Sequence, residues 1–123
     1  MAETNFIFTD LPQNRGFVAT VPAGIQSKIM LLETLGTALH FPDYYGINWD
    51  AFEECVRDLS WLPEHEVTIR HIDLPMAGDY FSVKTYVAIL KGAVEKWACE
   101  SSHRLVVVFP SELQLKVESL IEQ

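Results

Sequence analysis

Carboxylates and tyrosines gather within one short stretch of this sequence, between positions 44 and 54. Tyr44 and Tyr45 are adjacent, and Asp50, Glu53 and Glu54 follow shortly after them. Carboxylates can bind a basic protein surface, hold a divalent cation or exchange protons, and tyrosine supplies rigid contact area with a polar tip. These residue types therefore leave three kinds of site open: a protein-binding surface, a metal site and an acid–base site.

A helix should carry the three carboxylates. Pro42 and Gly46 mark a loop, and Asn48 is placed to cap the helix by accepting a hydrogen bond from a free backbone N–H. Helical spacing separates an apolar stripe from a charged face: Trp49, Phe52, Cys55, Val56 and Leu59 against Asp50, Glu53, Glu54, Arg57 and Asp58. We therefore expect an amphipathic helix near 49–60, with its two aromatic residues, Trp49 and Phe52, in the core.

A solvated helix face is the simplest explanation of such carboxylates, with Asp50 favourable near the helix N-terminus and Glu53 paired with Arg57. However, Asp50 and Glu54 are like charges one turn apart, which costs roughly 0.2–0.5 kcal/mol. A helix selected only for stability would avoid that arrangement. Beside two loop tyrosines, these carboxylates favour a surface that receives a cationic partner.

The order of residues in this stretch resembles the signature of the barstar family, small intracellular inhibitors of the ribonuclease barnase. The resemblance extends over residues 16–109 and is carried by Pro42-Asp43-Tyr44-Tyr45-Gly46, Asn48, Asp50-Ala51 and Glu54-Cys55. It implies a barstar-like α/β fold, whose loop and helix plug the active site of a nuclease. It also implies that the partner is a basic ribonuclease of the extracellular or toxin type.

Carried over residue by residue, the resemblance implies that Tyr44 packs on the nuclease and that Asp50 and Glu54 pair with its phosphate-binding residues. Glu54 stands where the family prototype has Asp, and Glu53 where it has Trp. Trp61 could flank the surface or close the core, and Glu95 corresponds only to a peripheral acidic contact. The expected partner-binding set is Tyr44, Tyr45, Gly46, Asn48, Asp50, Glu53, Glu54, Trp61 and Glu95.

The overall charge fits a basic protein partner. The 123 residues include 17 acidic and 9 basic side chains, for a net charge of −8. Nucleic acids and anionic membranes require a basic footprint, so neither is an expected partner. No apolar run approaches the ~18–20 residues of a membrane span, and no basic flank of a signal peptide is present. With Cys55 and Cys99 as reduced thiols, we expect a monomeric cytoplasmic protein that forms a one-to-one complex.

Strand and helix patterns alternate along the chain and predict a single domain over 1–123, a small parallel sheet packed by helices in two or three layers. Three strands are expected near 17–21, 66–72 and 104–109, and Phe6-Ile7-Phe8 is a possible extra edge strand. Helices are expected near 27–40, 49–60, 82–98 and 112–122. Ser27 should cap the first, and Ser111 with Gln114 should form a capping box at the extra C-terminal helix. Residues 1–15 and 110–123 are extensions beyond the resemblance that should join the same core.

Two alternatives to a ribonuclease inhibitor stay open. The same fold could serve as an interaction module for another basic protein. Less favoured is a carboxylate- or metal-dependent enzyme, which would need ligands converging on Asp50, Glu53 and Glu54 from other elements. We expect no metal or cofactor, because the glycines form no nucleotide fingerprint and no paired ligand spacing occurs among His40, His65, His71 and His103. A non-catalytic inhibitor is the primary expectation.

Overall fold

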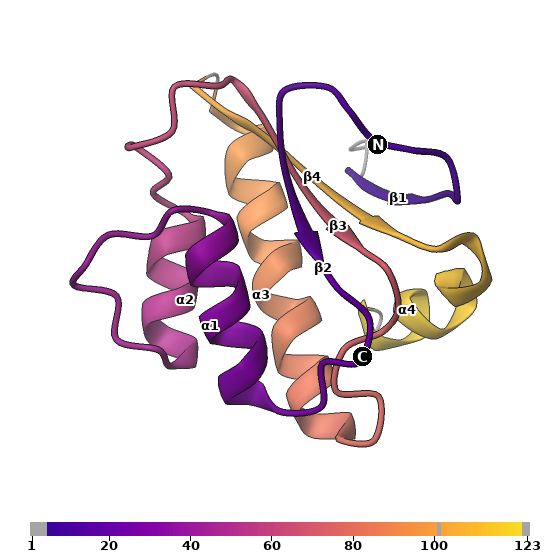
Figure 1. Ribbon diagram of the computed structural model, residues 1–123. Coiled ribbons are helices and arrows are strands. Elements are labelled where there is room, and N and C mark those ends of the chain that lie inside the picture. Colours follow the sequence, from indigo (N-terminus) through magenta and orange to yellow (C-terminus); the bar gives the residue numbers. More distant parts are fainter. Residues whose placement is uncertain (1–4, 101, 122–123) are drawn as a thin grey trace.

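The computed structural model describes residues 5–100 and 102–121, which form one four-stranded parallel sheet with helices packed against it (Figure 1). The strands run in the order β1-β4-β3-β2. Their bounds are β1 (Phe6–Phe8), β2 (Phe17–Val21), β3 (Glu66–His71) and β4 (Arg104–Phe109). The helices are α1 (Lys28–Ala38), α2 (Trp49–Val56), α3 (Tyr80–Ala98) and α4 (Gln114–Ile121), with the 3₁₀ helix η1 at Ser111–Leu113. The predicted parallel α/β fold, its edge strand and its C-terminal helix are confirmed.

Strand β4 lies between β1 and β3, and five of its six side chains are buried: Leu105, Val106, Val107, Val108 and Phe109. Its continuous apolar sequence is typical of a parallel strand covered on both faces. Helices α1, α2 and α3 lie together on one side of the sheet, and α4 packs beside α3 (Figure 1). Phe6 from the N-terminal extension and Val117 and Leu120 from α4 join the same core, as predicted. Positions 1–4 and 122–123 of the two extensions lie outside the described residues.

The acidic helix α2 ends at Val56 and not near residue 60, so this part of the prediction is wrong. The apolar spacing continues to Leu59, but Leu59 adopts a left-handed backbone with φ of 49° and is fully buried. Side chains from α3 bind the carbonyl groups at this end. Trp97 Nε1 donates to the Val56 oxygen at 3.0 Å, and Lys96 Nζ donates to the Arg57 oxygen. Hydrogen bonds from another helix thus replace the expected last turn.

Side-chain caps set the starts of α1 and α3. Ser27 caps α1 as predicted, accepting a hydrogen bond from the Met30 N–H at 3.2 Å. This helix ends at Ala38, two residues before its predicted end, and the chain then turns through His40 with φ of 57°. The start of α3 at Tyr80 precedes the predicted residue 82, because the cap is Asp79.

The capping box predicted at Ser111 does not form. The Ser111 hydroxyl and backbone N–H both donate to the carboxylate of Asp10, while the Gln114 amide donates to Glu118. Ser111 begins a 3₁₀ helix without a side-chain cap. Ser111 therefore connects the start of the C-terminal helical region to Asp10, in the segment after β1, although the two residues are far apart in the sequence.

A histidine is buried between the sheet and α3. His71 is 3% exposed, with Nδ1 2.9 Å from the Val108 oxygen and Nε2 2.6 Å from the Tyr86 hydroxyl. A neutral ring satisfies both contacts, since one nitrogen donates to the carbonyl and the other accepts from the hydroxyl. Burial lowers the pKa of His71 to about 4.

His71 should make folding sensitive to mild acid. Its ordinary pKa of 6.5 falls to about 4 in the folded chain, so the unfolded state binds a proton first as the pH falls. The contribution of His71 to stability is therefore complete above pH 6.5 and is lost towards pH 4, by about 3 kcal/mol. Urea unfolding over this range measures the loss. His71→Gln should reduce the dependence of the unfolding free energy on pH, whereas the control His65→Gln, at an exposed site, should not. An unchanged pH dependence in the His71 variant would contradict this assignment.

Candidate functional site

Asn48 fixes the junction between α2 and the loop that precedes it, residues 39–48. Its Oδ1 accepts from the Ala51 N–H at 2.8 Å, and its Nδ2 donates to the Gly46 oxygen at 3.0 Å. A Cβ on Gly46 would stand 3.2 Å from the Asn48 amide nitrogen and crowd this arrangement. The predicted cap is confirmed. Both residues position the loop within the chain, and their part in partner binding stays a prediction.

Tyr45 anchors the middle of the loop to α1. Its hydroxyl donates to the Leu32 oxygen at 3.1 Å, and its ring meets Phe41 edge to face with centroids 4.8 Å apart. The ring also lies against Gly36, where a Cβ would stand 2.8 Å from a ring carbon. Burial raises the pKa of Tyr45 well above its ordinary value. This tyrosine supports the loop and exposes only part of its surface.

Tyr44, in contrast, is 71% exposed. Partial desolvation raises its pKa, and nearby acidic groups, among them Asp58 and Glu54, raise it further. The Tyr44 hydroxyl therefore lies near the acidic side chains of α2 and of the turn that follows it. The two adjacent tyrosines thus have different surroundings, and Tyr44 is the more exposed of the two.

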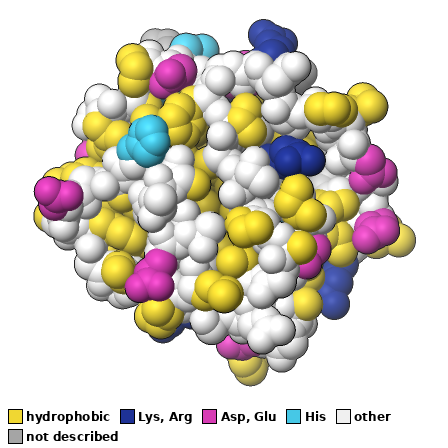
Figure 2. Space-filling model, viewed as in Figure 1, with side chains coloured by type: hydrophobic (Ala, Val, Ile, Leu, Met, Phe, Trp, Pro, Cys, Tyr) yellow, Lys and Arg dark blue, Asp and Glu magenta, His cyan; other side chains and the backbone are white. Residues whose placement is uncertain are grey.

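The three predicted carboxylates of α2 are exposed. Glu53 lies 3.9 Å from the Arg57 guanidinium, whereas no ion pair within the described residues involves Asp50 or Glu54. In Figure 2, acidic and hydrophobic atoms share the left part of the molecule, where Figure 1 places the loop and α2. The loop and α2 therefore expose the aromatic ring of Tyr44 and the carboxylates of Asp50 and Glu54, which form no ion pair with other described residues.

The tryptophans near this surface belong to the core. Trp49 packs beside Phe52 and Tyr86, as the helical spacing predicts. The Trp61 indole N–H donates to the Leu39 oxygen at 2.9 Å and the ring is partly buried, so Trp61 closes the core beneath the loop. Of the two roles that the sequence leaves open for Trp61, the structure favours the second.

Glu95 lies on the exposed side of α3, 3.8 Å from Lys91 Nζ in its own helix. It therefore differs from Asp50 and Glu54 in having a basic neighbour. Asp58, on the charged face predicted for the helix near 49–60, is among the acidic groups that raise the pKa of Tyr44. One residue that matters to the site is missed by sequence reasoning: Gly36 provides the place where Tyr45 rests. A glycine inside a helical pattern is the signal that could have indicated this packing role.

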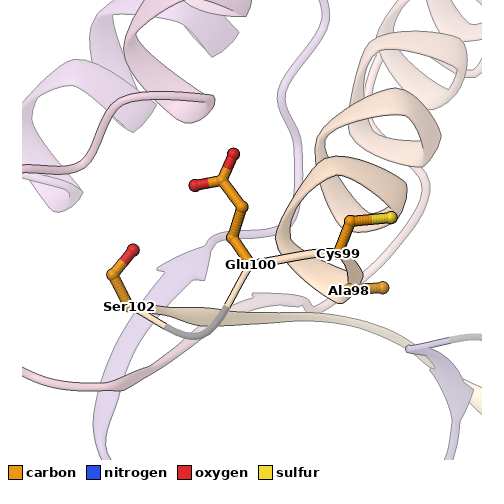
Figure 3. A pocket seen from close by; sticks show the side chains of 4 residues that line it. All are labelled: Ala98, Cys99, Glu100 and Ser102. Atoms are coloured by element: carbon orange, nitrogen blue, oxygen red, sulfur yellow. The ribbon is translucent and has the colours of Figure 1, made fainter.

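Hollows also lie away from this surface, one of them lined in part by Asp10, Arg70 and Glu112. A hollow of about 550 Å³ at the end of α3 is lined by Ala98, Cys99, Glu100 and Ser102. Figure 3 shows that these side chains point in different directions, so the Cys99 thiol is not aimed at the neighbouring carboxylate. Over residues 5–100 and 102–121, no cluster of three or more His, Cys, Asp or Glu side chains could hold a metal ion. No helix in the same ranges has the length and apolar content to cross a bilayer.

The fold and this surface define a class of protein: a parallel α/β domain that presents a loop with an exposed tyrosine and an acidic helix. A family model described as Barstar (barnase inhibitor) matches residues 17–110, most of the chain. The chain belongs to the barstar family, a family of protein inhibitors of barnase. Comparisons with curated proteins and with solved structures give no match. The matched range includes the loop and α2 and leaves out β1 and α4.

Replacing Gly36 by Ala should displace the loop. The added Cβ would stand 2.8 Å from the Tyr45 ring, so the ring must move and its hydrogen bond to Leu32 is lost. Alanine gains about 1 kcal/mol in helix preference, which offsets part of the loss. We expect a net decrease in the free energy of unfolding of about 1–2 kcal/mol, measured by urea denaturation.

A second background tests whether Tyr45 is the cause. With Tyr45→Ala already present, Gly36→Ala should stabilise the protein by up to about 1 kcal/mol, because the obstructing ring is gone. Gly78→Ala is the surface control, since a Cβ there meets nothing within 4 Å, and it should change stability by less than about 0.5 kcal/mol. Destabilisation by Gly36→Ala that persists without the Tyr45 ring would refute the proposed contact.

Proposed function

We propose that this protein inhibits a basic ribonuclease by covering its active site with the surface formed by Tyr44, Asp50 and Glu54. One observation carries the proposal: in a barstar-family chain, Asp50 and Glu54 are exposed on α2 and have no ionic partner within the described residues, and Glu54 is among the acidic groups that raise the pKa of the exposed Tyr44. A nuclease holds its anionic substrate with basic side chains. The same side chains can pair with carboxylates that arrive on a protein surface.

Inhibition by this route needs no catalytic group on the inhibitor. Asp50 and Glu54 occupy the arginine and lysine side chains that would bind phosphate, and Tyr44 packs against the rim of the active site. The net charge of −8 attracts a basic enzyme before contact. The complex is one-to-one and forms in the cytoplasm, where it protects the host from a nuclease made by the same or a neighbouring cell.

The two departures from the family prototype bear on which nuclease is recognised. Glu54 has one more methylene than Asp, so it reaches an arginine from a greater backbone distance. Glu53 replaces an aromatic side chain and has Arg57 3.9 Å away in its own helix. The opposing surface of the nuclease should therefore be more basic, and less suited to an aromatic contact, than the surface that the prototype meets.

The proposal is tested by capture and by inhibition. The protein is immobilised to capture partners from host extract, and it is added at equal molarity to a panel of barnase-type ribonucleases acting on RNA. Loss of RNA hydrolysis together with capture of a ribonuclease is expected. The matched bait is the double variant Asp50→Ala/Glu54→Ala, which should fold and capture nothing specific. Capture of a basic protein without nuclease activity, with no inhibition across the panel, would instead support an interaction module.

Alanine substitutions separate a binding site from a solvated face. Asp50→Ala or Glu54→Ala should weaken binding by about 2–5 kcal/mol, the general cost of truncating one member of a buried charge pair, because a buried partner charge loses its counterion; the barnase–barstar interface is itself a standard example of such pairs. Folding stability should stay constant or rise slightly as like-charge repulsion is relieved. Calorimetric titration and urea unfolding of the same variants measure both quantities.

Neighbouring carboxylates provide the controls for this series. Asp58→Ala at the periphery should cost under about 1 kcal/mol of binding, and Glu112→Ala, on η1 beyond the family match, should cost nothing measurable. Glu53→Ala distinguishes two roles of Glu53. A small loss of binding free energy indicates that Glu53 stays paired with Arg57, and a large loss indicates that it belongs to the interface. Equal small losses at every position would show that the face contributes only diffuse charge.

Association should depend steeply on salt. A clustered acidic face on a chain of net charge −8 steers a basic partner, so the association rate should fall as ionic strength rises while dissociation changes little. Barnase–barstar is the standard case of this behaviour. Stopped-flow mixing at several salt concentrations measures the slope, which should be shallower for Asp50→Asn/Glu54→Gln. A flat association rate would exclude electrostatic steering.

A further inference from the structure

A groove lies between α1 and the loop, beside the surface formed by Tyr44, Asp50 and Glu54. It encloses about 510 Å³. One wall consists of Glu33, Gly36 and Thr37, which recur at helical spacing on α1, and the other includes Phe41, Tyr45 and Ile47 from the loop. Because Tyr45 lines the groove and is next to Tyr44 in the chain, the same loop contributes to both the groove and the surface already described.

Glu33 is the one carboxylate in the lining of this groove. It is exposed, and no ion pair within residues 5–100 and 102–121 includes it. The opposite wall is largely aromatic and aliphatic. A carboxylate facing apolar side chains suits a long basic side chain, whose stem contacts the apolar wall while its charge meets the carboxylate. His40 also lines the groove, but its ring packs edge to face on Phe17, 5.2 Å away.

Ile47 adds a second, independent observation. Its backbone is left-handed, with φ of 45°, a conformation that is an outlier for a β-branched residue. Such strain costs on the order of 1–3 kcal/mol and is found in proteins at ligand-binding and switch positions. Here the strained residue holds an apolar side chain, 37% exposed, at the edge of the groove. Strain that holds an apolar side chain in the same groove as Glu33, which forms no ion pair within the described residues, is consistent with a contact site.

We propose that this groove binds an arginine side chain of the partner protein, with Glu33 pairing with the guanidinium and Tyr45 and Ile47 covering the stem. The proposal rests on the proposed function and extends it: the groove is a second contact beside the acidic face. The arginine that occupies the groove is not one of the phosphate-binding residues of the nuclease. Glu33 and Ile47 therefore select among nucleases by whether a basic side chain stands opposite the groove.

A titration that does not require the nuclease tests the groove. N-acetyl-argininamide is added to the ¹⁵N-labelled protein, and the neutral N-acetyl-citrullinamide is the matched probe. Saturable shifts are expected at the amides of Gly36, Thr37 and Ile47 with the cationic probe only. Glu33→Gln should weaken the fitted affinity at least about fivefold, and Glu112→Gln should leave it unchanged. Equal shifts with both probes, or shifts confined to α2, would overturn the proposal.

The ribonuclease complex gives the second readout. With a ribonuclease obtained by capture or from the panel, Glu33→Gln should speed dissociation about five- to twentyfold while inhibition at saturating protein is retained. An unchanged dissociation rate in Glu33→Gln would refute the proposed arginine contact in the groove, while the proposed inhibition would be unaffected. If no ribonuclease binds, the proposed function fails, and the probe titration still decides whether the groove binds a cation.

Discussion

The acidic surface depends on the contact between the Tyr45 ring and Gly36. This contact brings the loop against α1 at the one point where the helix has no side chain, and the Tyr45 hydroxyl then reaches the Leu32 carbonyl. Tyr44 is the residue immediately before Tyr45. The position of the Tyr45 ring therefore also determines where the exposed Tyr44 ring lies. Asn48 then joins the loop to the first turn of α2, because its side chain accepts a hydrogen bond from the Ala51 N–H. A loop held in this way has little freedom left to lose when a partner binds, which favours affinity.

The far end of α2 is held as firmly as its start. A helix of eight residues is marginal by itself, because its first turn is costly to form and few hydrogen bonds follow. Here Trp97 and Lys96 bind the carbonyls that the helix leaves free. His103 then spans the turn beyond them, with ring nitrogens 2.9 Å from the Leu59 and Glu64 oxygens. Packing of the core thus stabilises the short helix that carries the acidic face.

Local rules were sufficient for the parts of the fold that depend on neighbours in sequence. Strand–helix alternation predicted the parallel sheet, and Ser27 and Asn48 cap their helices as their chemistry suggests. The end of α2 was missed because its carbonyls are bound from α3, and the capping box failed because Ser111 has its partner at Asp10, near the other end of the chain. No rule of spacing identifies such distant partners.

The candidate site shows the same division. Its acidic residues and its family could be identified from the order of residues between Pro42 and Cys55, and the family match agrees. The resemblance singled out Tyr44, but the supporting role of Tyr45 could not be predicted, because it depends on contacts with Gly36, Leu32 and Phe41. The tryptophans were assigned correctly where helical spacing applies, at Trp49, and left open at Trp61, which lies beyond the helix.

Strand β1 has a consequence for how the molecule meets other copies of itself. It lies outside the family match and pairs with β4 over three residues, from Phe6 opposite Val107 to Phe8 opposite Phe109. Without it, β4 would be the end of the sheet, and a row of free backbone amides and carbonyls along an aliphatic strand is a template for aggregation. Strand β1 is too short to offer much of a template in its turn. The N-terminal extension therefore guards the most apolar strand of the protein against pairing with another chain.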